Sequence, residues 1–166
     1  MIQVRQGVFE TNSSSTHVLC IAREKTKPLD RIEFRLNNFG WGHDVYHDPS
    51  VKASYVYTAA CAYYKKDMAD RISELLSPYG IECIFIEHPI YDKYGIEENP
   101  HLYLKNGGID HVDECEDILN KLLNDPALLI DFIFGDKSYL ETGNDNDEDE
   151  YPACENPQCE HIFLRK

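Results

Sequence analysis

Two Asp-Pro pairs constrain this chain more than any other feature of its sequence. Asp48-Pro49 and Asp125-Pro126 each join a capping side chain to a proline, which the first turn of a helix tolerates. Apolar residues at helical spacing follow each pair, as far as Tyr63 in the first case and Phe134, just before Gly135, in the second. Both segments are therefore predicted to be helices.

Two more helices follow from the same kind of pattern. Asp67 opens a segment with apolar residues at helical spacing, and the breakers from Ser77 to Gly80 end it. The spacing of apolar residues from Val112 to Leu123 predicts the other helix. The helices thus fall into two groups along the chain.

Short apolar runs between turn residues predict the strands, at residues 4–9, 17–22, 32–36, 81–87, 138–141 and 161–164. Residues 37–47, rich in Asn, Gly and His, are expected to form a loop with a role beyond connection. Residues 88–108 are expected to form a long crossing loop with one edge strand at 102–104. This order of elements predicts an α+β fold, in which a mixed β-sheet carries about four helices packed largely on one face.

Length and charge limit the number of domains and the class of partner. The 166 residues, 42% of them hydrophobic, suffice for one core, so we expect a single domain over residues 1–166. The net charge of −14 makes duplex DNA an unfavourable partner, because binding to phosphates needs Lys and Arg. Residues 141–160 hold eight acidic residues and no Lys or Arg, and a mobile acidic loop is expected at 143–153. The rest of the chain is mildly acidic, which leaves the neighbourhoods of Arg5 and Lys52 free to meet an anion.

The sequence also predicts where the protein resides. The first residues lack the apolar stretch of a signal peptide, and no stretch approaches the roughly 20 apolar residues of a membrane-spanning helix. Cys20 and Cys83 lie inside apolar runs, as buried thiols do, so a disulfide framework is not expected. We expect a cytoplasmic protein without a membrane partner.

The densest polar cluster runs from Glu10 to His17, with Arg5 five residues before it. Hydroxyls and backbone amides in a tight loop can surround an anion, Arg can pair with it, and His can move a proton near neutral pH. The same composition is typical of a hairpin loop whose side chains only cap the backbone. On the functional interpretation, Glu10 and His17 are catalytic and a phosphate or nucleotide is bound by Arg5, Asn12, Ser13, Ser14 and Ser15.

Residues 5–17, Arg-Gln-Gly-Val-Phe-Glu-Thr-Asn-Ser-Ser-Ser-Thr-His, resemble the opening of a group of uncharacterised proteins encoded by bacteriophages and prophages. Residues 52–58, 108–111 and 134–146 are similar to the same group. After Asp110-His111 the resemblance implies a Gln-Ser pair, whereas this chain has Val112-Asp113. The resemblance implies a viral origin, and hence the host cytoplasm, but no particular chemistry.

Asp110-His111 follows a Gly-Gly turn and precedes a predicted helix. If the N-terminal loop folds against this pair, the two segments form one polar pocket suited to phosphate-ester hydrolysis or phosphoryl transfer. Arg5 would then hold the anion, and His17 or His111 would act as general acid or base. Alternatively, Asp110 or Asp113 caps the helix and His111 is a surface residue whose polar groups are satisfied.

Two His and Cys groups are candidates for a metal. Cys154, Cys159 and His161 offer three ligands for zinc, with a fourth to come from elsewhere, such as His17, His111 or water. A reduced cysteine pair without metal fits the same spacing. His43 and His47 would share one face of a helix, but their Gly and Pro neighbours argue against a helix there. The acidic run at 144–150 lacks the Gly and the final acid of an EF-hand loop.

Two functions remain open at this stage. The first is a phage or prophage accessory protein with a small anion-binding site and hydrolase or phosphoryl-transfer activity on a phosphorylated ligand. The alternative is a non-catalytic acidic protein that binds and inhibits a host defence or nucleic-acid protein by occupying its basic surface. Binding of the second kind needs carboxylates spread over one ordered face, whereas an enzyme needs only a local site.

Overall fold

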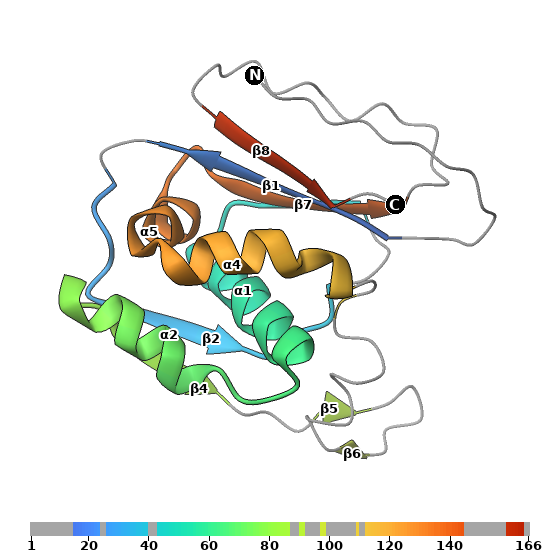
Figure 1. The fold of residues 1–166 in the computed structure, drawn as a ribbon, viewed down its shortest axis with the longest axis horizontal. Helices are drawn as coiled ribbons and strands as arrows, with labels where there is room; N and C mark the ends of the chain where they lie inside the picture. The colour runs from blue at the N-terminus through green and yellow to red at the C-terminus, as the bar shows by residue number, and fades with distance from the viewer. Residues whose placement is uncertain are drawn as a thin grey trace.

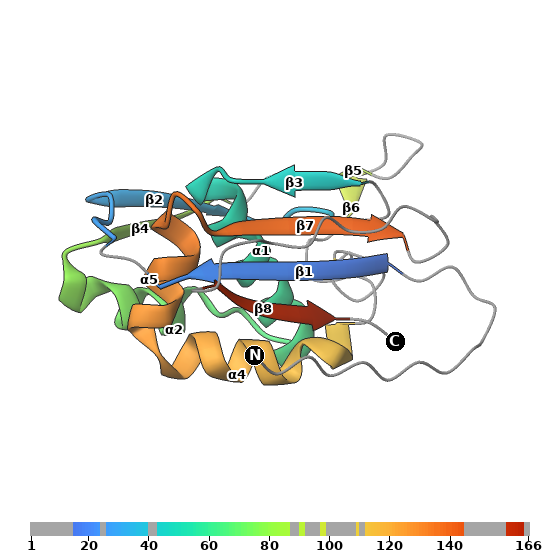
Figure 2. The ribbon, with the colours of Figure 1, turned by 90° about the horizontal axis from the view of Figure 1, so that it is seen from above.

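The computed structural model describes residues 15–23, 26–39, 43–86, 90–91, 97–98, 109, 112–144 and 159–164. Its largest sheet has four antiparallel strands in the order β3, β7, β1, β8. Figure 2 shows these strands side by side from above. They are β1 (Ser15–Ala22), β3 (Asp44–Tyr46), β7 (Tyr139–Asn144) and β8 (Cys159–Leu164). The central strand β1 therefore pairs on both sides with strands from the other end of the sequence.

Two smaller pairings lie outside this sheet. Strands β2 (Arg31–Arg35) and β4 (Glu82–Ile86) form a parallel pair. Strands β5 (Ile90–Tyr91) and β6 (Glu97–Glu98) form a short antiparallel pair. The predicted α+β class is confirmed, with the parallel and antiparallel pairings divided between separate sheets.

The helices fill the space between the four-stranded sheet and the parallel pair (Figure 1). Helices α1 (Pro49–Tyr64), α4 (Glu116–Asn124) and α5 (Pro126–Phe134) lie under one face of the large sheet. Helix α2 (Ala69–Leu76) packs against β4. Two short 3-10 helices, η1 (Ser77–Tyr79) and η2 (Val112–Cys115), follow α2 and precede α4.

Both Asp-Pro helix starts are confirmed. The Asp48 carboxylate accepts hydrogen bonds from the amides of Ser50 (2.8 Å) and Val51 (3.1 Å). The Asp125 carboxylate accepts one from the amide of Leu128, at 3.1 Å. Each carboxylate satisfies amides that the first turn of a helix leaves without an intrahelical partner.

Helix α1 differs from the others because it is buried on every side. All residues from Lys52 to Ala62 are buried, whereas α2 and α4 each bury one face. A helix enclosed on all sides belongs to the interior of a layered domain. Here the enclosing layers are the large sheet, the parallel pair and the neighbouring helices.

The structure also corrects several element boundaries. Residues 37–47 are not wholly a loop, because Asp44–Tyr46 forms β3 on the edge of the large sheet. The predicted acidic loop does not begin at residue 143, because β7 continues to Asn144. The strand expected to be buried at 81–87 is present as β4 (Glu82–Ile86), where Glu82 is exposed and the other residues are half-buried. The strands predicted at 4–9 and 102–104 lie outside the described residues.

Candidate functional site

A row of polar side chains crosses one end of the large sheet. His17 on β1 pairs in register with Thr142 on β7, and Thr142 pairs with Asp44 on β3. Directly paired residues in an antiparallel sheet share a face, so these three side chains project to the same side. We call His17, Thr142 and Asp44 the polar row. It lies on the helix-covered face, because His17 contacts Tyr55 of α1.

The polar row runs from the interior to the surface. His17 is 2% exposed and Thr142 is 1% exposed, whereas Asp44 is exposed to solvent. The Tyr46 hydroxyl donates a hydrogen bond to the Asp44 carboxylate at 3.1 Å. Burial raises the pKa of Tyr46, Asp44 raises it further, and Thr142 opposes the rise. An imidazole, two hydroxyls and a carboxylate thus lie on one face of the sheet, and their access to water increases from His17 to Asp44.

Aromatic rings back this row on the helix side. The His17 and Tyr55 ring centroids are 5.6 Å apart, and the Tyr55 and Phe39 centroids are 5.1 Å apart in an edge-to-face arrangement. Phe39 in turn meets Tyr46 edge-on at 6.2 Å. Burial raises the pKa of Tyr55 well above its ordinary value, and the Cys115 thiol beside it adds to the effect. The Tyr55 phenol therefore stays protonated and can act only as a neutral group.

The second half of the predicted pocket begins close to this cluster. Phe39 forms a parallel bridge with Ile109, the residue directly before Asp110-His111. Cys115, four residues after His111, ends η2 beside Tyr55. The backbone on either side of the Asp110-His111 pair is thus anchored to residues that also contact the polar row. Asp110 and His111 themselves lie outside the described residues.

Of the site residues predicted from sequence, only His17 has a described side chain. Ser15 begins β1 opposite Asn144, and Cys159 and His161 lie on β8 opposite Ala22 and Cys20. The others lie outside the described residues: Arg5, Glu10, Asn12, Ser13, Ser14, Asp110, His111 and Cys154. The N-terminal cluster therefore enters the described fold at Ser15, and His17 is its first residue with a described side chain.

The sequence did not indicate Thr142, Asp44 or Tyr46 as neighbours of His17. Thr142 follows the predicted end of its strand, and β3 has only three residues, too few for alternation to be recognised. Tyr55 is one of the apolar residues whose spacing predicts the helix after Pro49. Its contact with His17 depends on packing between α1 and the sheet, which that spacing does not predict.

Lys52 lies in a second buried polar cluster, on the same helix. Its side chain is fully buried, and Nζ donates hydrogen bonds to the carbonyls of Gly135 (3.0 Å) and Ser138 (2.8 Å). The Ser138 hydroxyl accepts from the Ala22 amide at 3.0 Å and donates to the Asp131 carbonyl at 2.7 Å. We call these contacts the Lys52 network. The expectation that Lys52 could meet an anion is wrong, because its ammonium is enclosed and bound to the main chain.

Gly135 is required by the same turn. A Cβ at this position would lie 2.7 Å from the Ser138 hydroxyl and closer still to the Asp131 carbonyl. Contacts this short do not occur for real Cβ atoms, so another residue would have to displace the turn. The turn between α5 and β7 is therefore built around a glycine, a serine and a lysine from a distant helix.

The four stretches behind the resemblance to phage proteins meet around α1. His17 of the first stretch contacts Tyr55 of the second, and Lys52 of the second contacts Gly135 of the fourth. Ile109 of the third bridges Phe39, whose ring also contacts Tyr55. Segments far apart in the sequence thus form one structural unit.

Metal ligands do not gather in the described part of the chain. No group of three His, Cys, Asp or Glu residues that could hold a metal occurs there. His43 and His47 flank the extended strand β3, so they do not share one face of a helix. Within this part of the chain Cys20, Cys61, Cys83 and Cys115 are thiols rather than halves of disulfides. The full set of Cys154, Cys159 and His161 is not described.

Comparison of the chain with protein families, curated proteins and solved structures found no match. Among the described helices, none has the length and apolar character needed to span a bilayer. The polar row and its aromatic backing therefore supply the functional argument.

Proposed function

We propose that this protein is a phage or prophage accessory protein that acts on a small phosphorylated ligand, such as a phosphate ester or nucleotide, at the sheet end marked by the polar row. The observation that carries the proposal is the register of His17, Thr142 and Asp44, backed by Tyr55. Imidazole, hydroxyl and carboxylate groups are those that move protons near neutral pH.

The sequence adjoining the row supplies the anion-binding groups of this proposal. Residues 11–16, directly before His17, form a segment rich in hydroxyls, and Arg5 precedes that segment. Asp110 and His111 follow Ile109, which is joined to Phe39. Hydroxyls and Arg5 hold the phosphate, while His17, assisted by its neighbours, transfers the proton.

Burial defines the role of His17 in this proposal. With 2% exposure, the ring works in a low-dielectric setting, where its interactions with neighbouring dipoles are stronger than in water. Asp44, at the exposed end, connects the row to solvent. The proton therefore passes between the protected imidazole and groups along the row.

The test is a panel of nucleotides and simple phosphate esters assayed for phosphate release and for binding by calorimetry. The variant is His17→Gln, which keeps a polar side chain of similar reach, and the matched control is His47→Gln, whose ring packs on Tyr139 at 5.6 Å. We expect His17→Gln to lower turnover roughly 100-fold, the usual contribution of a general acid or base. His47→Gln should stay within about twofold of wild type.

Two results would contradict the proposal. One is a wild-type protein that neither binds nor converts any member of the panel. The other is a His17→Gln variant that loses melting temperature but retains full turnover per folded molecule. A protein that instead occupies a basic host surface would show the first result, together with partner binding that weakens as salt rises.

A further inference from the structure

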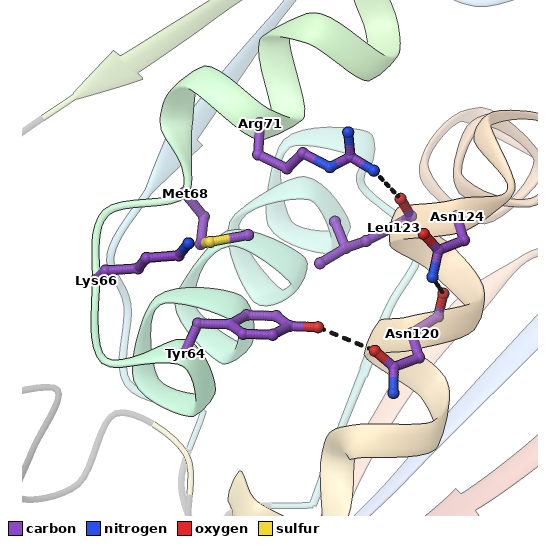
Figure 3. Close-up of a pocket in the computed structure, with 7 residues that line it drawn as sticks. All are labelled: Tyr64, Lys66, Met68, Arg71, Asn120, Leu123 and Asn124. Atoms are coloured by element: carbon purple, nitrogen blue, oxygen red, sulfur yellow. Dashed lines mark hydrogen bonds between the residues drawn. The ribbon is translucent and has the colours of Figure 1, made fainter.

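A polar groove lies between the end of α1, the turn into α2 and helix α4 (Figure 3). Its volume is about 310 Å³, at the lower end of the range for small-molecule sites. Tyr64, on its wall, lies nine residues beyond Tyr55 on α1, about 13 Å further along the helix axis. The groove is therefore a different place from the polar row.

The turn between α1 and α2 fixes one wall. Lys65 closes α1 in the left-handed conformation, at φ 53°. The Asp67 carboxylate then accepts hydrogen bonds from the Ala69 amide (2.9 Å) and the Tyr57 hydroxyl (3.0 Å). These bonds hold the backbone between them, so Lys66 and Met68 are presented to the groove by an ordered turn.

The opposite wall presents two amide side chains. The Tyr64 hydroxyl donates to Asn120 Oδ1 at 3.0 Å, which leaves Asn120 Nδ2 as a donor. Asn124 Nδ2 donates to the Asn120 carbonyl at 2.7 Å, which leaves Asn124 Oδ1 as an acceptor. A donor and an acceptor thus lie one helical turn apart on α4, and both kinds of group can hydrogen-bond to a nucleobase.

Two cations reach the groove from the other side. Figure 3 shows Lys66 and Arg71 on the wall formed by the turn and α2, facing the amides of α4. Arg71 Nη2 donates to the Leu123 carbonyl at 3.1 Å, which orients the guanidinium and leaves its other N–H groups for a ligand. Met68 and Leu123, 5% and 4% exposed, form an apolar floor between the walls.

From these features we infer that the groove binds a nucleoside monophosphate. Its phosphate lies between Lys66 and Arg71, and its base lies against Met68 and Tyr64 with its polar edge on Asn120 and Asn124. Guanidinium and ammonium groups bind phosphate through charge-assisted hydrogen bonds, and an aromatic ring accepts the face of any base. In a chain of net charge −14, paired cations beside amides favour a small anion over a nucleic-acid strand.

Calorimetric titration of the full-length protein with the four common ribonucleoside monophosphates tests this site. Inorganic phosphate and the matching nucleosides serve as separate probes. We expect one nucleotide bound at this groove per chain, more tightly than either phosphate or nucleoside alone, and weakened in the groove variant Lys66→Glu but not in the polar-row variant His17→Gln. Lys66→Glu should weaken binding about tenfold or more, because it replaces an attraction by a repulsion.

Lys27→Glu, an equal charge change at another exposed lysine, is the matched control and should stay within about twofold. His17→Gln should retain nucleotide binding, which separates this site from the proposed catalytic one. The inference is overturned if no monophosphate binds at millimolar concentration, if phosphate alone binds as tightly as the nucleotides, or if Lys27→Glu weakens binding as much as Lys66→Glu.

Discussion

The polar row and the Lys52 network are both polar clusters against α1, yet they differ in which atoms lie next to their side chains and in whether they reach solvent. In the Lys52 network, side chains bind main-chain atoms: Lys52 holds two carbonyls, and Ser138 joins an amide to a carbonyl. In the polar row, side chains of three strands lie on one face of the sheet, from buried His17 to solvent-exposed Asp44.

This difference distinguishes a structural role from a chemical one, although both clusters consist of polar side chains. Main-chain partners cannot leave, so the Lys52 network fixes the turn between α5 and β7 and has no capacity for a ligand. The polar row, by contrast, holds groups that can transfer protons and reaches solvent at Asp44. We therefore assign stability to the Lys52 network and propose chemistry only for the polar row.

The largest expected effect on stability is that of Lys52→Met. Methionine has similar length but leaves two buried carbonyls without the hydrogen bonds from Nζ. We expect the free energy of unfolding, measured in urea, to fall by about 3 kcal/mol. Lys27→Met, at an exposed lysine, is the control and should change it by less than about 0.5 kcal/mol. Equal losses of unfolding free energy in Lys52→Met and Lys27→Met would contradict a structural role for Lys52.

Gly135→Ala should have the next largest effect, because its Cβ would collide with the Asp131 carbonyl and the Ser138 hydroxyl. We expect a loss of about 2 kcal/mol of unfolding free energy. Gly80→Ala offers a contrast, because its Cβ would meet no atom within 4 Å but the backbone has φ +75°. That strain should cost about 1 kcal/mol. A larger loss of unfolding free energy in Gly80→Ala than in Gly135→Ala would show that the turn after α5 can shift to accommodate a Cβ.

The smallest effect concerns Glu141, which precedes Thr142 on β7 and therefore faces the other side of the sheet. Burial raises the pKa of the Glu141 carboxyl, and the charge of His43 partly opposes the rise. The folded protein thus keeps this proton to higher pH than the unfolded chain, so stability falls as pH rises through the carboxyl range.

Glu141→Gln should remove that loss. We expect the variant to melt above wild type at neutral pH, with the difference fading on acidification below the ordinary carboxyl pKa. Glu82→Gln, at an exposed strand residue, is the control and should leave the pH profile of melting temperature unchanged. A Glu141→Gln variant less stable than wild type at neutral pH would mean that the charged carboxylate is needed.

Local signals predicted most of the fold. Asp48 and Asp125 act within their own helices, so the sequence alone located both starts. The short apolar run at residues 17–22, next to a polar loop, likewise located the central strand. Strand β3 was missed because three residues carry too little pattern, and its pairing with β7 joins residues almost a hundred positions apart.

The candidate site was predictable only in part, since its geometry depends on long-range register. Sequence selected His17 by residue type, but its alignment with Thr142 joins residues 125 positions apart. Lys52 was misjudged because a lysine near a helix start is usually solvated, and α1 is enclosed on every side. The enclosure of α1 depends on how the large sheet, the parallel pair and the neighbouring helices pack, so no single segment of the sequence predicts it.

The most direct measurement compares turnover per folded molecule in His17→Gln and Ser138→Ala. Both variants are assayed on the best substrate of the panel, and urea unfolding gives the folded fraction of each. Ser138 belongs to the Lys52 network, and its loss breaks hydrogen bonds to Ala22 and Asp131. Our account predicts that Ser138→Ala loses stability but keeps wild-type turnover, while His17→Gln keeps most of its stability and loses turnover roughly 100-fold. Equal turnover in both variants, or a loss confined to Ser138→Ala, would contradict it.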